Sequence, residues 1–158
     1  NPLDKNTDIG AINSVEQLDR IKNLVKAGKQ EGACMWQPPG GVPRKGNWFK
    51  PTLFTECAQS HRIVQEEIFG PVLTIQSFRT PQEALTKANN TPYGLSGGVW
   101  TDKGSKIFKM TAGLKAGVVW ANTFNKFDPT SPFGGYKESG IGREGGLQGL
   151  ASYCQIIH

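Results

Sequence analysis

The clearest periodic pattern of apolar residues lies near the start of the chain. Ser14 is followed three positions later by Gln17, which is the spacing of a capping box at a helix N-terminus. Apolar residues then recur at helical spacing, and these are Val15, Leu18, Ile21, Leu24 and Val25. The pattern predicts an amphipathic helix that ends near Gly28. A loop rich in Pro and Gly over Met35–Asn47 and a short strand over Trp48–Thr55 are expected to follow.

From residue 72 onward, strand and helix patterns alternate. Val72–Phe78 is a run of β-branched and aromatic residues, and a helix start follows it directly. Thr80 is the predicted cap, Pro81 occupies the first helical position, and Glu83 completes a capping box. This helix is expected to end near Asn89 and Asn90.

The same alternation continues through a second strand, a second helix and a third strand. Leu95–Trp100 is the second strand, Asp102 is the predicted cap of the second helix, Gly117 its end, and Val118–Ala121 the third strand. Strands separated by helices pair in parallel with the helices packed on the sheet. The predicted fold class is therefore α/β, with a parallel sheet inside three αβα layers.

A long connection follows the third strand. Thr123–Gly146 contains six glycines and two prolines and has no period of its own. It leaves the carboxyl end of a parallel strand, where open α/β sheets bind their ligands. It is also too rich in aromatic residues for a disordered linker. A pocket-lining loop is the favoured interpretation, and a merely packed surface loop is the alternative.

One segment of this loop, Gly140–Gly145, matches the G-x-G-x-x-G pattern of dinucleotide-binding turns. That pattern should follow an apolar strand directly and be answered by an acidic residue about 20 positions later. Here it follows Tyr136–Ser139, and the chain ends 13 residues beyond Gly145. A pyrophosphate-binding role is therefore not expected.

The composition is that of a globular protein of 158 residues, with 37% hydrophobic and 20% charged residues and no apolar run of membrane length. Three cysteines, Cys34, Cys57 and Cys154, form no CxxC pair, so neither a disulfide framework nor a metal site is expected, and a cytoplasmic location fits best. The net charge of +5 comes from dispersed lysines. These indicate solvated helix faces rather than a phosphate-binding stripe, and no nucleic-acid or membrane partner is expected. A basic nucleic-acid binder stays open as an alternative function, and it would bind with an affinity that falls steeply with salt.

Two motifs in order resemble signatures of the aldehyde dehydrogenase superfamily. Glu66–Val72 is similar to its E-E-x-F-G-P motif, and Ser131–Glu144 is similar to its S-P-F-G-G-x-K-x-S-G-x-G-R-E motif. Asn90–Leu95 and Pro2–Gly10 resemble further family segments, so the similarity spans essentially the whole chain. The run Trp120–Pro129 suggests family sixteen of the superfamily.

This resemblance implies that residues 1–158 form the C-terminal part of a catalytic domain. The cofactor-binding domain and the nucleophile segment then belong upstream. In such enzymes a cysteine thiolate attacks an aldehyde, a hydride passes to the nicotinamide of NAD or NADP, and water activated by a glutamate hydrolyses the thioester to a carboxylic acid.

The resemblance also assigns roles to four residues. Glu67 corresponds to the glutamate that accepts hydrogen bonds from the nicotinamide ribose, and Phe69 to the aromatic residue beside the nicotinamide. Phe127 and Phe133 correspond to residues that line the aldehyde tunnel. Without the resemblance, Glu66 and Glu67 are a solvated pair, and both phenylalanines are core residues under a long loop.

None of the cysteines lies in the family's nucleophile context, so no catalytic residue is assigned. Cys57 and His61, four residues apart, are treated as a chance pair because no orienting partner is evident. The fragment alone is expected to be inactive. A non-catalytic relative that serves as a binding or scaffold module is the alternative function. The resemblance further implies a homo-oligomeric parent enzyme, whose C-terminal strand would fall after Tyr153.

Overall fold

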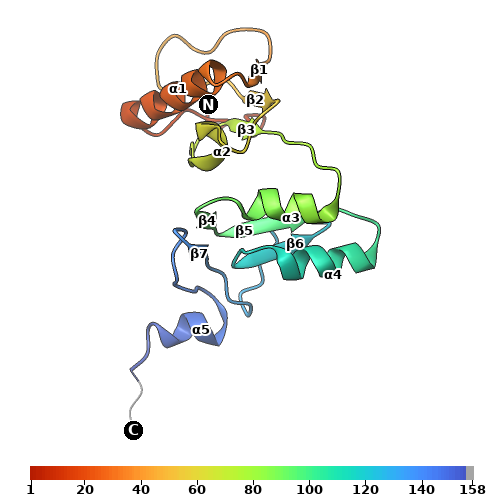
Figure 1. The fold of residues 1–158 in the computed structure, drawn as a ribbon. Helices are drawn as coiled ribbons and strands as arrows, with labels where there is room; N and C mark the ends of the chain where they lie inside the picture. Colours follow the sequence, from red (N-terminus) through yellow and green to blue (C-terminus); the bar gives the residue numbers. More distant parts are fainter. Residues whose placement is uncertain (156–158) are drawn as a thin grey trace. The chain divides into compact units, whose positions relative to one another are not determined.

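The computed structural model describes residues 1–155, which divide into two compact units, Asn1–Ser77 and the chain from Phe78 onward (Figure 1). Residues 156–158 lie outside the described residues. No helix within residues 1–155 combines the length and the apolar character needed to cross a membrane.

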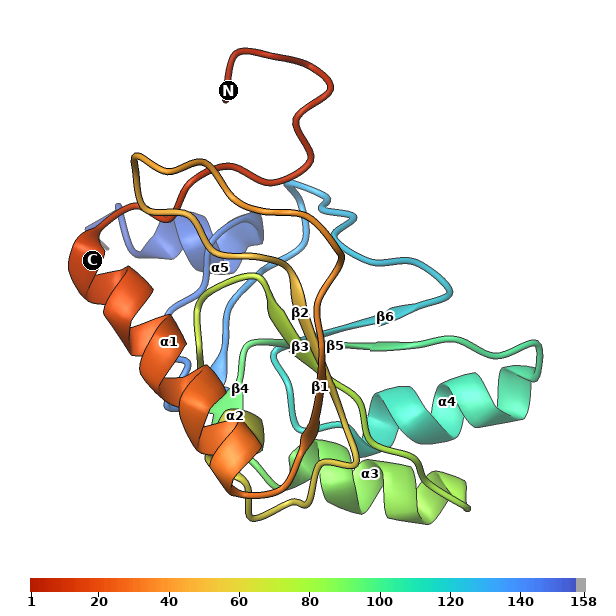
Figure 2. The ribbon, with the colours of Figure 1, turned by 90° about the horizontal axis from the view of Figure 1, so that it is seen from above.

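The first unit is one long helix on a small mixed sheet. Its elements in chain order are α1 (Val15–Gln30), β1 (Cys34–Trp36), β2 (Thr52–Thr55), α2 (Arg62–Gln65) and β3 (Val72–Thr74). The strand order is β1-β2-β3, with β1 antiparallel and β3 parallel to β2. Figure 2 shows α1 running alongside this sheet.

The predicted amphipathic helix is confirmed, and its apolar face forms the core of the first unit. Leu18, Ile21, Leu24 and Val25 are buried, and Ile21 and Phe54 are completely excluded from water. Ser14 caps the helix as expected, because its hydroxyl accepts a hydrogen bond from the Gln17 N–H at 3.1 Å. Val15, the first residue of the helix, is 57% exposed and does not belong to this buried face.

The second unit carries the predicted alternation of helices and strands. Its elements are α3 (Pro81–Asn89), β4 (Tyr93–Gly94), β5 (Ser96–Val99), α4 (Gly104–Gly113), β6 (Val118–Ala121), β7 (Tyr136–Lys137) and α5 (Gly146–Ala151). Strands β5 and β6 pair in parallel over four residues, and α3 and α4 lie side by side next to them (Figures 1 and 2). The α/β class is confirmed, and so is the parallel pairing of the second and third predicted strands. The first predicted strand is β3, and it pairs with β2 in another sheet rather than with β5.

Antiparallel pairs and shorter strands are the main departures from the prediction. Strands β1 and β2 pair antiparallel, as do β4 and β7, so the pairing is mixed rather than wholly parallel. Met35 and Trp36, assigned to a loop, lie in β1. Strand β3 ends at Thr74 instead of Phe78, because the last ladder bond runs from the Ile75 N–H to the Phe54 carbonyl.

Both ends of α4 also differ from the prediction. Lys103, and not Asp102, is the N-cap, because the Thr101 hydroxyl accepts the Lys103 N–H at 3.2 Å and holds Asp102 in a turn. The helix ends at Gly113, four residues before Gly117. Asn89 causes this end, since its side-chain amide donates to the Gly113 carbonyl and accepts from the Lys115 N–H, both at 2.8 Å.

Candidate functional site

The first candidate site is the turn after α2, and its two adjacent glutamates have different environments. Glu66 forms a two-point ion pair with Arg62, with Nε–Oε1 and Nη2–Oε2 distances of 2.5 and 3.1 Å. The hydrogen bond from Arg62 lowers the pKa of Glu66, and the same contact raises the pKa of Arg62. The Glu66 carboxylate is therefore already bound to Arg62 of the same chain.

Glu67 and Phe69 both extend into solvent. No group of residues 1–155 hydrogen bonds to the Glu67 carboxylate, and that side chain is exposed. Phe69 is 76% exposed, whereas Ile68 between them is buried in the core. Phe69 also has a φ of 53°, a left-handed conformation that is unusual for a residue with a side chain. The turn thus presents an unpaired carboxylate and an exposed ring two residues apart.

Helix α1 holds this turn through the backbone. Gln17 Nε2 donates to the carbonyls of Ile68 and Phe69 at 2.8 and 3.0 Å, and Arg20 Nη2 donates to the carbonyl of Glu67 at 2.9 Å. The sequence pattern predicts only a capping-box role for Gln17. The sequence contains no signal for its second role, because its partners lie 51 and 52 residues away.

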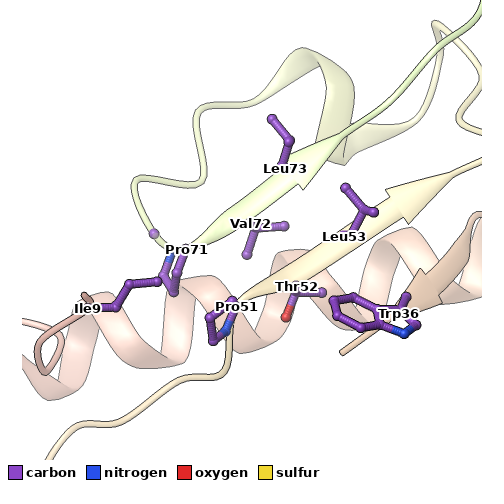
Figure 3. Close-up of a pocket in the computed structure, with 9 residues that line it drawn as sticks. Ile9, Trp36, Pro51, Thr52, Leu53, Pro71, Val72 and Leu73 are labelled. Carbon is purple, nitrogen blue, oxygen red and sulfur yellow. The ribbon is translucent and has the colours of Figure 1, made fainter. Parts of the chain in front are cut away.

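A cavity of about 430 Å³ lies beside the same turn, but the exposed side chains of Glu67 and Phe69 do not line it. Gly70 and Pro71 line it, together with a cross-strand row of apolar residues. That row is Trp36, Leu53 and Leu73, which are partners in the strand register (Figure 3). Thr52 is the one polar lining residue, and its hydroxyl is already bonded to Gln37 and Lys50. The lining of this cavity is therefore mostly apolar, and neither of the proposed cofactor contacts belongs to it.

The second candidate site is the aromatic row in the loop after β6. Phe127 and Phe133 meet edge to face, with ring centroids 5.0 Å apart and an interplanar angle of 79°. The buried Trp120 of β6 holds this pair in place. Its ring centroid lies 5.6 Å from that of Phe127, and its indole N–H donates a hydrogen bond to the Lys126 carbonyl at 2.8 Å. Phe127 is 59% exposed and is therefore not a core residue, while Phe133 is half-buried.

The backbone that carries Phe133 is a pinned hairpin. Phe133 and Glu144 exchange backbone hydrogen bonds at 2.7 and 2.8 Å. The Arg143 guanidinium donates to the carbonyls of Gly135 and Gly142, both at 2.8 Å, and lies 5.2 Å from the centre of the Tyr136 ring. The residues that match G-x-G-x-x-G thus close a hairpin. The two-residue strand before them, β7, pairs antiparallel with β4.

The cysteines do not resemble activated nucleophiles. Burial raises the pKa of Cys57, and its thiol lies 3.7 Å from the Thr55 carbonyl rather than on His61. The His61 Nδ1 accepts the Ala58 N–H at 3.3 Å. A hydrogen bond from the Cys34 thiol to Glu56 at 3.2 Å raises the pKa of Cys34. The described residues also contain no cluster of three or more potential metal ligands.

The structure thus brings together the members of each predicted pair. Glu67 and Phe69 stand out from one turn, and Phe127 and Phe133 touch each other.

Comparisons with known proteins agree with these motifs. The chain matches the aldehyde dehydrogenase family over residues 1–158. It is 42% identical over 156 residues to an aldehyde dehydrogenase-like protein of Schizosaccharomyces pombe, covering 98% of this chain and 32% of that protein. It is 40% identical over 160 residues to a betaine aldehyde dehydrogenase of Brucella anthropi, covering 98% of this chain and 33% of that one.

The fold matches as well. A betaine aldehyde dehydrogenase of Staphylococcus aureus, solved in complex with NAD⁺, superposes with a TM-score of 0.90 at 41% identity, covering 97% of this chain and 31% of that one. The chain belongs to the aldehyde dehydrogenase family. It spans about a third of the length of these relatives. Its placement in family sixteen stays a prediction.

Proposed function

We propose that this chain is the C-terminal part of the catalytic domain of a longer aldehyde dehydrogenase, the parent enzyme, which oxidises an aldehyde to a carboxylic acid with NAD or NADP. Membership of the family and the coverage of one third of its relatives support this proposal. The chain contributes cofactor and aldehyde contacts, and the nucleophilic cysteine is supplied by the rest of the parent enzyme.

The observation that carries the proposal is the contrast between Glu66 and Glu67. A carboxylate can accept two hydroxyl donors at once, which suits the two hydroxyls of the nicotinamide ribose. Of the two glutamates only Glu67 is free to do so, because Arg62 occupies Glu66. The exposed Phe69 ring nearby offers an apolar surface for the nicotinamide. When bound, the nicotinamide accepts the hydride that leaves the aldehyde carbon.

Phe127 and Phe133 are the proposed aldehyde contacts. Two rings packed edge to face form an apolar wall that excludes water along one side of a substrate path. Trp120 and the pinned hairpin hold the two rings in place, so the wall is preformed before an aldehyde arrives. The preferred substrates are therefore aldehydes with an apolar group that can pack against the two aromatic rings.

The parent enzyme is proposed to be a cytoplasmic homo-oligomer. Three cysteines without disulfide bonds support a reducing compartment.

Replacing each of the two glutamates in turn tests the cofactor assignment. Glu67→Gln in the parent enzyme is expected to weaken NAD⁺ or NADP⁺ binding about tenfold, because an amide accepts fewer hydrogen bonds than a carboxylate. Glu66→Gln is the matched control and should leave binding near that of the wild type. Titration by protein fluorescence measures both affinities. Equal effects of the two substitutions, or none at Glu67, contradict the proposal.

The same titration separates catalysis from a binding or scaffold role. Cofactor binding together with aldehyde-dependent NADH or NADPH formation identifies a working enzyme. Cofactor binding without turnover by the parent enzyme identifies a non-catalytic relative.

A further inference from the structure

We infer that a second cavity, here named the lysine cavity, binds an organic carboxylate that has an apolar body. The cavity has a volume of about 500 Å³, within the usual range of small-molecule pockets. Its walls come from α1, from β1 and from the connection between β1 and β2. Glu67 and Phe69 do not line it, and neither do the α1 residues that bind their backbone, Gln17 and Arg20. The inference is therefore independent of the proposed function.

Positive charge dominates the polar part of the lysine cavity. Lys22, Lys26 and Lys29 line it, and no acidic residue does. The Lys22 ammonium group is paired with Asp19 at 3.1 Å. Among residues 1–155, the side chains of Lys26 and Lys29 have no hydrogen-bond or ion-pair partner. Two exposed ammonium groups thus border the cavity without a counterion from the described part of the chain.

The spacing of these lysines along α1 favours an anion between them. Lys26 lies four residues after Lys22 and three before Lys29, so the three side chains are neighbours on the helix surface. Like charges at these spacings repel each other and destabilise a helix. An anion bound in the cavity offsets this repulsion, whereas a neutral ligand does not. Gln30 also lines the cavity and carries an amide that can donate a hydrogen bond.

The rest of the lining is apolar and packs on the core of the first unit. Val25 is buried, and Met35 and Phe49 are half-buried residues that pack against the core cluster. Close packing leaves such side chains little freedom to move. The cavity therefore offers a fixed apolar surface beside two unpaired ammonium groups.

The connection that carries Phe49 is held by hydrogen bonds. Lys50 Nζ donates to the Pro38 carbonyl at 3.1 Å, which ties the end of the connection to its beginning. The Ile12 N–H donates to the Asn47 carbonyl at 2.7 Å and ties the same connection to the segment before α1. This wall of the cavity is therefore in place before a ligand arrives, so binding costs little in ordering the protein.

The charged and apolar surfaces together define the class of ligand. A carboxylate has two oxygens and can accept hydrogen bonds from Lys26 and Lys29 at once. An apolar body attached to the carboxylate covers Met35 and Phe49 and removes apolar surface from water. A small inorganic anion uses only the charged surface, and a neutral hydrocarbon uses only the apolar one. A carboxylate with an apolar body is therefore bound best.

Replacing Lys26 and Lys29 together in the parent enzyme tests the site. Lys26→Gln with Lys29→Gln removes both charges and keeps long polar side chains on an exposed helix face, so the fold is expected to persist. Lys106→Gln with Lys109→Gln is the matched control, because these two exposed lysines have the same spacing on α4.

Decanoate is the probe, and two measurements are made with it. Calorimetric titration gives its affinity, and amide hydrogen exchange shows where on the chain it binds. We expect decanoate to slow exchange over residues 22–30 and 35–50, and to bind about fivefold more weakly when Lys26 and Lys29 are replaced. The control pair should leave the affinity unchanged. The exchange pattern also separates this site from decanoate bound at the proposed aldehyde contacts.

Two further ligands separate the contribution of the charge from that of the apolar body. Decanol has the same body without the charge, and hexanoate has the same charge on a shorter body. Each should bind to the wild-type parent enzyme about fivefold or more weakly than decanoate does. Raising the salt concentration should weaken the binding of decanoate and not that of decanol, because salt screens only the charge.

Four results would each contradict the inference. Unchanged affinity after replacement of Lys26 and Lys29, or protection that lies outside residues 22–30 and 35–50, shows that decanoate binds elsewhere. An equal loss of affinity in the control pair shows an effect of net charge alone. Equal affinities for decanol and decanoate show that no anion is recognised, and no binding of decanoate at all removes the site. Failure of the Glu67→Gln test leaves these results intact, because Glu67 does not line the lysine cavity.

Discussion

At the scale of single residues, neighbours along the chain differ because their surroundings differ. Glu66 is paired with Arg62, Glu67 is unpaired, Ile68 is buried and Phe69 is exposed. A motif places these residue types in order. The contacts around each side chain then determine which of the two carboxylates is available to a ligand.

The Arg62–Glu66 pair leads to a prediction on pH dependence. Because the folded state lowers the pKa of Glu66, the pair stabilises the fold above the ordinary glutamate pKa, and this contribution is lost as pH falls through the lowered value. Glu66→Gln should therefore reduce stability slightly at pH 7 and flatten its fall with acid. The effect is small because the two side chains are 54% and 37% exposed. Urea unfolding between pH 3 and 7 measures it, and an unchanged acid profile would contradict it.

At the scale of elements, the two helices beside β5 and β6 begin differently. In α3, the Thr80 hydroxyl accepts the Glu83 N–H at 3.1 Å, and Pro81 occupies the first turn. In α4 the N-cap is Lys103, whose side chain makes no capping bond and brings a positive charge to the positive end of the helix dipole. The start of α4 is therefore a weak point of the second unit.

Lys103→Ser is expected to stabilise α4. Lys103 already has the extended backbone of an N-cap, and a serine hydroxyl there can accept an unpaired N–H of the first turn. The expected gain in the free energy of unfolding is about 0.5–1 kcal/mol. Thermal unfolding monitored by circular dichroism measures this gain. Lys109→Ser, in the interior of the same helix, is the control and should bring no gain.

The hairpin that carries Phe133 depends on a close approach of two glycines. A Cβ atom on Gly117 would lie 1.6 Å from the Gly134 carbonyl oxygen, so one of the two backbones would have to move. Gly117→Ala should cost about 3 kcal/mol or more, at the upper end for overpacking. It should also change the near-UV circular dichroism of the aromatic row.

Gly142→Ala is the control in the same hairpin, because a Cβ atom at Gly142 has no neighbour within 4 Å. Urea unfolding of the two variants compares their stabilities. Equal stability would show that the hairpin yields to the added methyl group.

At the scale of the whole molecule, this chain spans about a third of the length of its relatives, and we propose that it is one part of a larger enzyme. It divides into two compact units, each with one of the proposed contact pairs. Two of its three cysteines have surroundings that disfavour a nucleophile, because burial raises the pKa of Cys57 and a hydrogen bond to Glu56 raises that of Cys34. Both thiols are thus biased against the thiolate that attack on an aldehyde requires.

A protein made only of residues 1–158 is therefore expected to produce no NADH from NAD⁺ and an aldehyde. Absorbance at the NADH band during incubation with several aldehydes measures this. Any turnover that Cys57→Ser abolishes would identify Cys57 as a nucleophile and overturn its assignment as part of a chance pair with His61.

Much of the secondary structure could be predicted from the sequence, because helix caps and apolar periods are local. The start of α1, the start of α3 and the bounds of β6 all agree with the prediction. The failures have partners far along the chain. Asn89 ends α4 through contacts with residues 24 and 26 positions away. Strand β1 is too short to show a period, and its pairing with β2 makes it a strand.

The sequence by itself determined the family, the α/β class, the parallel β5–β6 pair and the residue types at both candidate sites. Each of these follows from motifs and patterns within a short stretch of chain. The tertiary structure alone decided that Glu66 is paired, that Gln17 holds the turn and that Phe127 packs against Phe133. These outcomes depend on side-chain contacts that form only when the chain folds, and no local pattern encodes which atoms then meet.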